Sequence, residues 1–114
     1  MNNKTLTYGN VDMLVLKLLD NQDMYGYEII EQLSEQSNNV FKLSAGSLYP
    51  LLHNLESKRL VESYDAEAKS PGKPRKYYKI TRKGKQYLED KSKEWERHSH
   101  AINKILFNEG RLPI

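Results

Sequence analysis

Apolar residues recur at helical spacing through the first third of the chain. In the earliest such segment they are Val11, Leu14, Val15, Leu18 and Leu19. Spacing of three and four residues places side chains on one face of a helix, so we expect a helix over residues 10–20. A second helix is predicted from Met24 to Gln36, with Ile29, Ile30 and Leu33 directed inward.

The second helix contains a glycine, and a short connection follows the helix. Gly26 weakens the first turn, because glycine loses more backbone freedom than other residues, and this indicates close packing or a tight entry there. Residues 37–44 form the connection. In it we expect Val40, Phe41 and Leu43 to tuck inward as a short extended piece.

A third helix is predicted over residues 45–58, with leucines along one side. These are Leu48, Leu51, Leu52 and Leu55. Ser44 or Ser47 can cap the start of this helix. Because proline is tolerated only in the first turn, the hydrogen-bonded part should begin late, and a start at Ser47 makes Pro50 the third helical residue.

Two short strands and a long helix complete the chain. LVESY (residues 60–64) and RKYYKI (residues 75–80) are rich in β-branched and aromatic residues. The segment between them contains two prolines and a glycine, which indicates a hairpin loop longer than the tight types. Thr81 is expected to cap a helix that extends to about Asn108. The predicted fold is therefore mainly α with a small β-hairpin (α+β).

Positive charge is concentrated in one internal segment, although the net charge of the whole chain is only +3. Residues 1–68 hold 5 basic and 10 acidic side chains, and residues 86–114 hold 5 of each. Residues 69–85 (KSPGKPRKYYKITRKGK) hold 8 basic side chains and no acidic one. Such a local field attracts polyanions, chiefly nucleic acid or an anionic membrane surface.

Length and composition narrow the class of protein. The 114 residues suffice for one domain with a modest core. The absence of cysteine excludes disulfides and thiolate metal sites. Because there is no signal pattern and no apolar run long enough for a bilayer, we expect a soluble, cytoplasmic protein without a membrane partner.

The inventory of reactive side chains does not support an enzyme. His98 and His100 are two residues apart, so on a helix they diverge by about 200° and cannot share a metal ion. His53 has no evident acid or nucleophile near it in sequence, and no phosphate-binding glycine loop with a following lysine is present. We therefore expect no metal and no cofactor.

The polar side of the third helix is the first candidate binding surface. It carries Gly46, Pro50, His53, Asn54 and Ser57. This face has little bulk, no charge and several hydrogen-bonding groups, which suits a DNA major groove. A merely polar surface is the alternative, and the helix alone does not decide between them. The DNA-contact candidates on this helix and at its ends are Ser44, Ser47, Tyr49, His53, Asn54 and Lys58.

A basic hairpin directly after such a helix favours DNA binding. The candidate phosphate contacts on it are Lys69, Lys73, Arg75 and Lys76, and the cations expected to extend the field are Arg82, Lys83 and Lys85. A solubilising charge cluster is the alternative, but like charges repel one another when no polyanion is near. Because strand residues alternate, one of Tyr77 and Tyr78 must face the core.

The last helix carries an apolar seam that a body of this size cannot cover. The seam consists of Leu88, Trp95, Ile102, Ile105 and Leu106, and it is interrupted by Lys91 and His98. The first three apolar residues are seven apart, as in a coiled coil. We expect the seam to form a homodimer interface, which would place two reading helices about one DNA turn (~34 Å) apart.

Three stretches resemble the PadR family of transcriptional regulators, in its short subclass with one C-terminal helix. They are MYGYEII (24–30), GSLYPLLHNLE (46–56) and PGKPRKYYKITRKG (71–84). The resemblance implies a winged helix-turn-helix DNA-binding domain over residues 1–80, and a dimerisation helix and tail over residues 81–114. It also implies a homodimeric repressor on a roughly palindromic operator, with Tyr49 at the groove and the hairpin wing on the DNA backbone.

The resemblance also implies an effector site. Some short members bind flat aromatic drugs or phenolic compounds between paired tryptophans, which places a planar aromatic or phenolic effector at Trp95. Residues implied beside it are Asn10, Val11 and Ser99. From the seam alone, an interface anchor is the commoner role for a lone tryptophan.

One position departs from the family pattern. Arg59 stands where the family often has a glycine before the first strand. A left-handed helix end suits glycine and costs other residues about 1 kcal/mol. Either the chain leaves the helix differently or the site is mildly strained, and both leave the orientation of the wing open.

Two functions from different classes fit these observations. The first is a dimeric, effector-responsive repressor that binds duplex DNA. The alternative is a winged-helix protein-interaction module whose basic wing binds an acidic partner.

Overall fold

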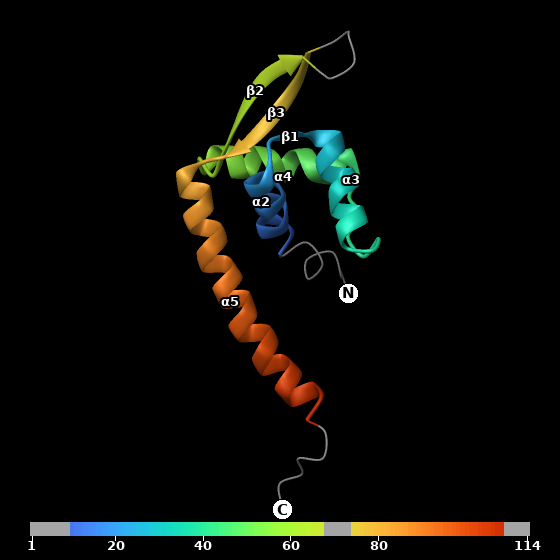
Figure 1. Cartoon of the computed structure of the whole chain (residues 1–114), viewed down its shortest axis with the longest axis vertical. Helices are drawn as coiled ribbons and strands as arrows, with labels where there is room; N and C mark the ends of the chain where they lie inside the picture. Colours follow the sequence, from blue (N-terminus) through green and yellow to red (C-terminus); the bar gives the residue numbers. More distant parts are fainter. Residues whose placement is uncertain (1–9, 68–73, 109–114) are drawn as a thin grey trace, which may run out of the picture.

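The computed structural model describes residues 10–67 and 74–108 of the chain. Its elements are, in order, α2 (Val11–Asn21), β1 (Met24–Tyr25), α3 (Gly26–Gln36), α4 (Ala45–Ser57), β2 (Val61–Glu67), β3 (Pro74–Ile80) and α5 (Arg82–Leu106). The β2–β3 hairpin projects from one end of the helical body (Figure 1). The helix α5 starts at the base of the hairpin and extends past the opposite end of the body. The predicted α+β class and the order of helices and hairpin are confirmed.

The hairpin belongs to an antiparallel sheet with the strand order β1-β3-β2. The strand β1 was not predicted, because the second helix was expected to begin at Met24. That start was wrong: Met24 and Tyr25 are extended and pair with Tyr78 and Tyr77, and the helix begins at Gly26. Two residues are too few to show strand alternation in a sequence, so only the pairing with β3 reveals this strand.

The hairpin strands are longer than predicted. Their pairing extends from Val61 opposite Ile80 to Glu67 opposite Pro74, which adds Asp65, Ala66 and Glu67 to the tip of β2. This tip is mostly polar and buries no apolar side chain, so it lacks the alternation of apolar and polar residues by which a strand is predicted. The remaining loop lies outside the described residues.

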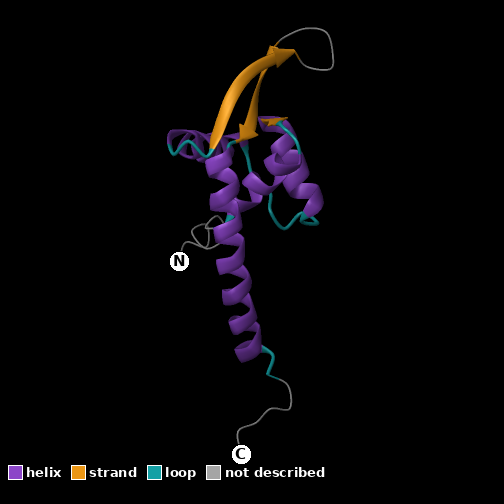
Figure 2. Cartoon of the chain, turned by 60° about the vertical axis from the view of Figure 1, so that its left-hand side comes forward, coloured by secondary structure: helices purple, strands orange, loops and turns teal. Residues whose placement is uncertain are grey.

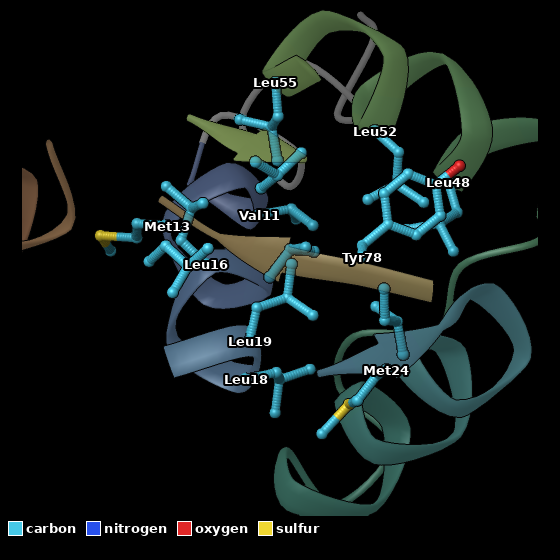
Figure 3. Packing of buried hydrophobic residues seen from close by; sticks show 14 of the residues in the cluster. Val11, Met13, Leu16, Leu18, Leu19, Met24, Leu48, Leu52, Leu55 and Tyr78 are labelled. Atoms are coloured by element: carbon cyan, nitrogen blue, oxygen red, sulfur yellow. The ribbon is translucent and has the colours of Figure 1, made fainter. Parts of the chain in front are cut away.

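The core lies between the helices and the inner face of the sheet (Figure 3). From β3 it takes Tyr78, which is 1% exposed and lies beside Leu48 and Leu52 of α4. Tyr78 is therefore the inward member of the tyrosine pair, and burial raises the pKa of its hydroxyl. Each buried leucine of this kind contributes about 1.5–3 kcal/mol to the stability of the fold.

The helix α4 begins earlier than predicted. The side-chain oxygen of Ser44 accepts a hydrogen bond from the Ser47 N–H at 3.2 Å, so Ser44 is the cap. Pro50 is therefore the sixth helical residue, and the expected start at Ser47 was wrong. Proline at this point deprives the Gly46 carbonyl of its helical partner. Gly46 is solvent-exposed, so water can take that place.

The connection between α3 and α4 forms no strand. Asn38 and Asn39 turn the chain with φ of 52° and 68°. Leu43 is buried and Phe41 packs against the core, but Val40 is 70% exposed, so its predicted inward position was wrong. The left-handed turn just before Val40 directs that residue away from the core.

Two glycines mark close approaches between elements. A Cβ at Gly26 would overlap the Tyr49 hydroxyl, so Gly26 lets the Tyr49 ring pack on the start of α3. A Cβ at Gly84 would overlap the Leu60 carbonyl oxygen and lie 2.8 Å from Ile80. The close packing expected at Gly26 is thus confirmed.

The first turns of α5 are fixed to the body. The Thr81 side chain accepts from the Gly84 N–H at 2.9 Å, which confirms Thr81 as the cap. The Tyr87 hydroxyl donates to the Asp12 carboxylate on α2 at 2.8 Å. The rest of α5 extends away from the body (Figure 2). None of the helices in the described ranges is long and apolar enough to cross a membrane.

Candidate nucleic-acid interface

The outer face of α4 is open to solvent along its whole length. The residues predicted to point outward are all exposed, namely Gly46, Pro50, His53, Asn54 and Ser57. The opposite side is buried through Leu48, Leu52 and Leu55, while Leu51 is half-buried. The helix lies across the body below the hairpin (Figure 1), and the Ser63 hydroxyl of β2 donates to the Glu56 carboxylate of α4, so α4 and the hairpin are neighbours.

Three polar side chains on α4 and at its end are available to a ligand. His53, Asn54 and Lys58 are exposed, and in the described part of the chain their side chains make no hydrogen bond or ion pair. The hydroxyls of Ser44 and Ser47 are already engaged with each other at the helix start, 3.4 Å apart. The middle and end of the helix therefore offer more free hydrogen-bonding capacity than its first turn.

Tyr49 lies at the flank of this face. Its side chain is 39% exposed. The ring packs on Gly26, so the first residue of α3 determines where the hydroxyl sits. Tyr49 therefore presents a fixed edge to the surface.

The outer face of the sheet carries a row of three tyrosines, one from each strand. The Tyr77 ring stacks on Tyr64 at a centroid distance of 5.8 Å and meets Tyr25 edge-on at 5.5 Å. The guanidinium of Arg75 lies 4.4 Å from the centre of the Tyr25 ring, a cation–π contact. The row confirms that Tyr77 faces outward, and it fixes the position of Arg75.

A second contact holds the far end of the row. The Tyr64 hydroxyl donates to the Asp23 carboxylate at 2.6 Å. That hydrogen bond raises the pKa of Tyr64 to about 12, because the acceptor stabilises the protonated hydroxyl. The outer face of the wing is thereby tied to the segment before β1.

The cations of residues 69–85 that the structure describes lie on two elements, β3 and the start of α5. Arg75 and Lys76 are exposed on β3, whereas Lys69 and Lys73 lie outside the described residues. Arg82, Lys83 and Lys85 lie at the base of the hairpin, at the start of α5. Lys85 is 3.9 Å from the Asp20 carboxylate, so part of this charge is offset locally.

The arrangement of an open helix, a hairpin wing and a projecting terminal helix is matched by a known family. The family model described as "Transcriptional regulator PadR-like family" matches residues 15–90 of the chain.

The chain belongs to the PadR-like family.

Relatives and solved structures agree with this assignment. An uncharacterised protein of Lysinibacillus sphaericus is 40% identical over 102 residues, which cover 90% of this chain and 91% of that protein. The crystal structure of a PadR family regulator from Clostridium difficile is 39% identical, with a TM-score of 0.76, covering 85% of this chain and 98% of that one. A PadR-like regulator from Bacillus cereus is 33% identical, with a TM-score of 0.78, covering 90% and 96%.

Membership of the family decides the class of function. PadR-like proteins are transcriptional regulators that bind DNA, so this PadR-like chain is a regulator and not an enzyme. The same neighbours confirm the winged-helix fold.

The residues expected around an effector are not all on the surface of the PadR-like chain. Trp95 is 46% exposed, and Ser99, one turn further along α5, is half-buried. Val11 is 1% exposed within the core of the single chain, so its side chain does not reach a surface there. Asn10, which precedes α2, is half-buried. Helical spacing identified Val11 as inward-facing but could not show how completely it is covered.

The apolar seam of α5 divides into two parts. Leu88 belongs to the core of the single chain, so its burial needs no partner. The exposed part consists of Trp95, Ile102, Ile105 and Leu106. Phe107, which directly follows the helix and is 66% exposed, extends this surface and was missed. Its aromatic side chain beside Leu106 was the available signal.

The carboxylates of β2 were also missed as part of the interface. Glu62, Asp65 and Glu67 are exposed on the strand next to the basic strand β3. A search for positive charge treats the two strands separately. Only their register shows which acid lies opposite which cation.

Proposed function

We propose that this PadR-like chain is a cytoplasmic repressor that binds a roughly palindromic operator in duplex DNA as a homodimer. The observation that carries the proposal is the exposed polar face of α4, with the free side chains of His53 and Asn54, on a helix that lies next to the hairpin. A surface helix normally carries glutamate and lysine on its outer face. An uncharged face with free amide and imidazole groups fits the floor of a major groove.

The two parts of the interface have different tasks. On α4, His53 and Asn54 contact base edges, and Tyr49 borders the groove. Contacts to phosphate come from the wing and from both ends of α4, and they position the protein without reading sequence. The residues proposed for them are Ser44, Ser47, Lys58, Lys69, Lys73, Arg75 and Lys76. This division corresponds to a DNA-binding domain over residues 1–80 and a dimerisation helix and tail over residues 81–114.

The homodimer is proposed to form along α5. The exposed apolar residues from Trp95 to Leu106 need a cover, and an identical helix supplies a matching one. A two-fold axis then presents two α4 helices to successive turns of the same DNA face. The same symmetry requires an operator with two inverted half-sites.

An effector is proposed to act at the centre of this dimer. Trp95 and its copy would stack on a planar aromatic or phenolic compound, with Ser99 and Asn10 nearby. Such a compound releases DNA only if it binds one separation of the two α4 helices more tightly than the other.

A mobility-shift titration at several salt concentrations tests the DNA-binding proposal. DNA binding predicts a linear fall of log affinity with log salt, and a specific duplex that outcompetes a random one. Binding to an acidic protein without any shift of duplex DNA at low salt would instead support the interaction module.

Two substitutions distinguish recognition of bases from binding to phosphates. Asn54→Ala should reduce the preference between operator and random duplex, because a base contact is worth about 1–3 kcal/mol of discrimination. Arg75→Ala should weaken both duplexes alike and lower the salt slope by about one. If both variants changed affinity and preference in the same way, the assignment of tasks would be wrong.

The effector site is tested by the fluorescence of Trp95, the single tryptophan of the chain. A planar aromatic cation or a phenolic compound that stacks on Trp95 should quench its emission and release bound duplex over the same concentration range. An unchanged signal across a broad panel would leave Trp95 as a plain interface residue.

A further inference from the structure

The two strands of the hairpin carry equal and opposite charge. On β3 the charged residues are Arg75, Lys76 and Lys79, and on β2 they are Glu62, Asp65 and Glu67. All six are exposed. The described strands of the wing therefore add no net charge to the molecule, although β3 alone is strongly basic.

The register places two of the cations opposite carboxylates. Asp65 pairs with Lys76, and Glu62 pairs with Lys79. Directly opposite residues of an antiparallel pair share a face of the sheet, with Cβ atoms about 4.5–5.5 Å apart. With a carboxylate and a cation at neighbouring positions on the same face, the field that reaches a phosphate beyond them is reduced.

Arg75 is the exception among these three cations. It lies opposite Ala66, which has no charge, and its guanidinium is held over the Tyr25 ring. A cation on an aromatic face keeps its full charge while its position is restrained. Arg75 is thus both uncompensated by its cross-strand neighbour and fixed in place.

We propose that β2 is an electrostatic restraint on DNA binding, in which Asp65 and Glu62 offset Lys76 and Lys79 so that Arg75 is the strand cation giving net attraction to phosphate. This inference rests on the proposed DNA-binding function. It assigns a role to the carboxylates of β2, which lower the affinity for every duplex regardless of sequence.

The two carboxylates are suited to this role because they have no structural one. In the described ranges, the side chains of Asp65 and Glu62 make no hydrogen bond and no direct ion pair. Asp65 shares the sheet face of Ser63 and Tyr78, which is the side that packs on α4. Asp65 therefore offsets Lys76 on the α4 side of the wing, whereas Glu62 offsets Lys79 on the outer face, which also carries Arg75.

The test uses the full chain and a labelled random-sequence duplex, because the restraint does not depend on sequence. Asp65→Asn should tighten binding by about two- to fivefold, with a steeper salt dependence, and Glu62→Gln should do the same. The control is Glu96→Gln, which removes one exposed carboxylate from α5, and its affinity should equal that of the wild type.

A charge-neutral double variant completes the design. Glu62→Ala with Lys79→Ala should bind within about twofold of the wild type, because it removes one carboxylate together with the cation opposite it, whereas Arg75→Ala should weaken binding roughly tenfold. Circular dichroism melting curves check that each variant is folded. Should Asp65→Asn be poorly folded, Glu62→Gln alone decides.

The outcomes distinguish failure of the electrostatic restraint from failure of the proposed DNA-binding function. A wild-type chain that binds no duplex at low salt removes the proposed function itself. A wild-type chain that binds, with folded Asp65→Asn and Glu62→Gln variants that bind no more tightly, overturns the electrostatic restraint and leaves the function intact.

Discussion

At the scale of single residues, side chains that are absent matter as much as those that are present. Gly84 lets the first turn of α5 lie against the Leu60 carbonyl, and Gly26 gives the Tyr49 ring its place. The first contact joins the residue before β2 to α5, and the second joins α3 to α4. Each position excludes residues larger than glycine, because a neighbouring atom occupies the space that a Cβ would need.

Gly84→Ala should lower the free energy of unfolding by about 2 kcal/mol, since the methyl group must displace backbone and not a flexible side chain. Urea denaturation at one fixed protein concentration measures the change, because a dimer's stability depends on concentration. Gly46→Ala is the matched control. Its nearest neighbour is the Ser44 hydroxyl at 3.7 Å, so it should raise stability by roughly 0.5 kcal/mol. Equal effects at both positions would contradict the close approach at Gly84.

A second prediction at this scale concerns alkaline pH. Burial and the hydrogen bond to Asp12 raise the pKa of Tyr87 from 10.0 to about 12. Between these values the folded state holds a proton that the unfolded state has lost, so stability falls as pH rises from 10 to 12 and is fully present below 10. Stability measured across that window should fall less steeply in Tyr87→Phe. The hydroxyl of Tyr64 adds to the wild-type slope, so some dependence should remain.

At the scale of elements, the end of α4 determines how the chain enters the hairpin. Arg59 has a φ of 63°, the left-handed conformation that the sequence left open. The Leu60 N–H donates to the Leu55 carbonyl and the Arg59 N–H to the Glu56 carbonyl, both at 2.9 Å, which is a Schellman motif. The helix therefore ends in the left-handed conformation that suits glycine, and Arg59 carries mild strain.

Arg59→Gly should relieve that strain and raise the free energy of unfolding by about 1 kcal/mol. Denaturant midpoints of the two proteins measure the gain. Arg59→Ala is the control, because it removes the same charge but keeps a Cβ, and it should leave stability nearly unchanged. A comparable gain in Arg59→Ala would mean that the charge, and not the backbone conformation, was the cause.

At the scale of the whole molecule, the projecting half of α5 is the feature that a single chain does not explain. The structure is elongated, with extents of 68 × 28 × 26 Å, and the last turns of α5 carry Ile105 and Leu106 at 81% and 65% exposure. Apolar side chains in a row at this exposure are typical of a surface that a partner covers. The proposed homodimer follows from this feature and would couple both DNA-reading helices to one interface.

Ile105→Asp should convert the proposed dimer to a monomer, because a carboxylate buried against the partner helix would lack a counter-charge. Sedimentation velocity measures the mass, and operator binding should weaken at least tenfold because only one reading helix remains. Lys93→Asp places the same charge on a polar position of the same helix and should stay dimeric. A dimeric Ile105→Asp would show that the interface lies elsewhere.

The sequence by itself determined which segments are helical, the cap at Thr81 and the family, because these depend on residues a few positions apart. It left Ser44 and Ser47 as alternative caps of α4, and the structure decided for Ser44. The periodicity of leucines in α4 was sufficient to separate its buried and open faces. The same local rules identified Arg75 and Lys76 as exposed cations on a strand. Whether these residues contact DNA stays a prediction.

Only the tertiary structure decided what depends on partners distant in the sequence. The pairing of Met24 with Tyr78 created β1, and the register of β2 with β3 placed Asp65 opposite Lys76. Long-range packing buried Leu88 in the single chain and left Phe107 exposed. The physical reason is that hydrogen-bonded pairing and burial are properties of two segments together, whereas a sequence pattern reports on one segment at a time.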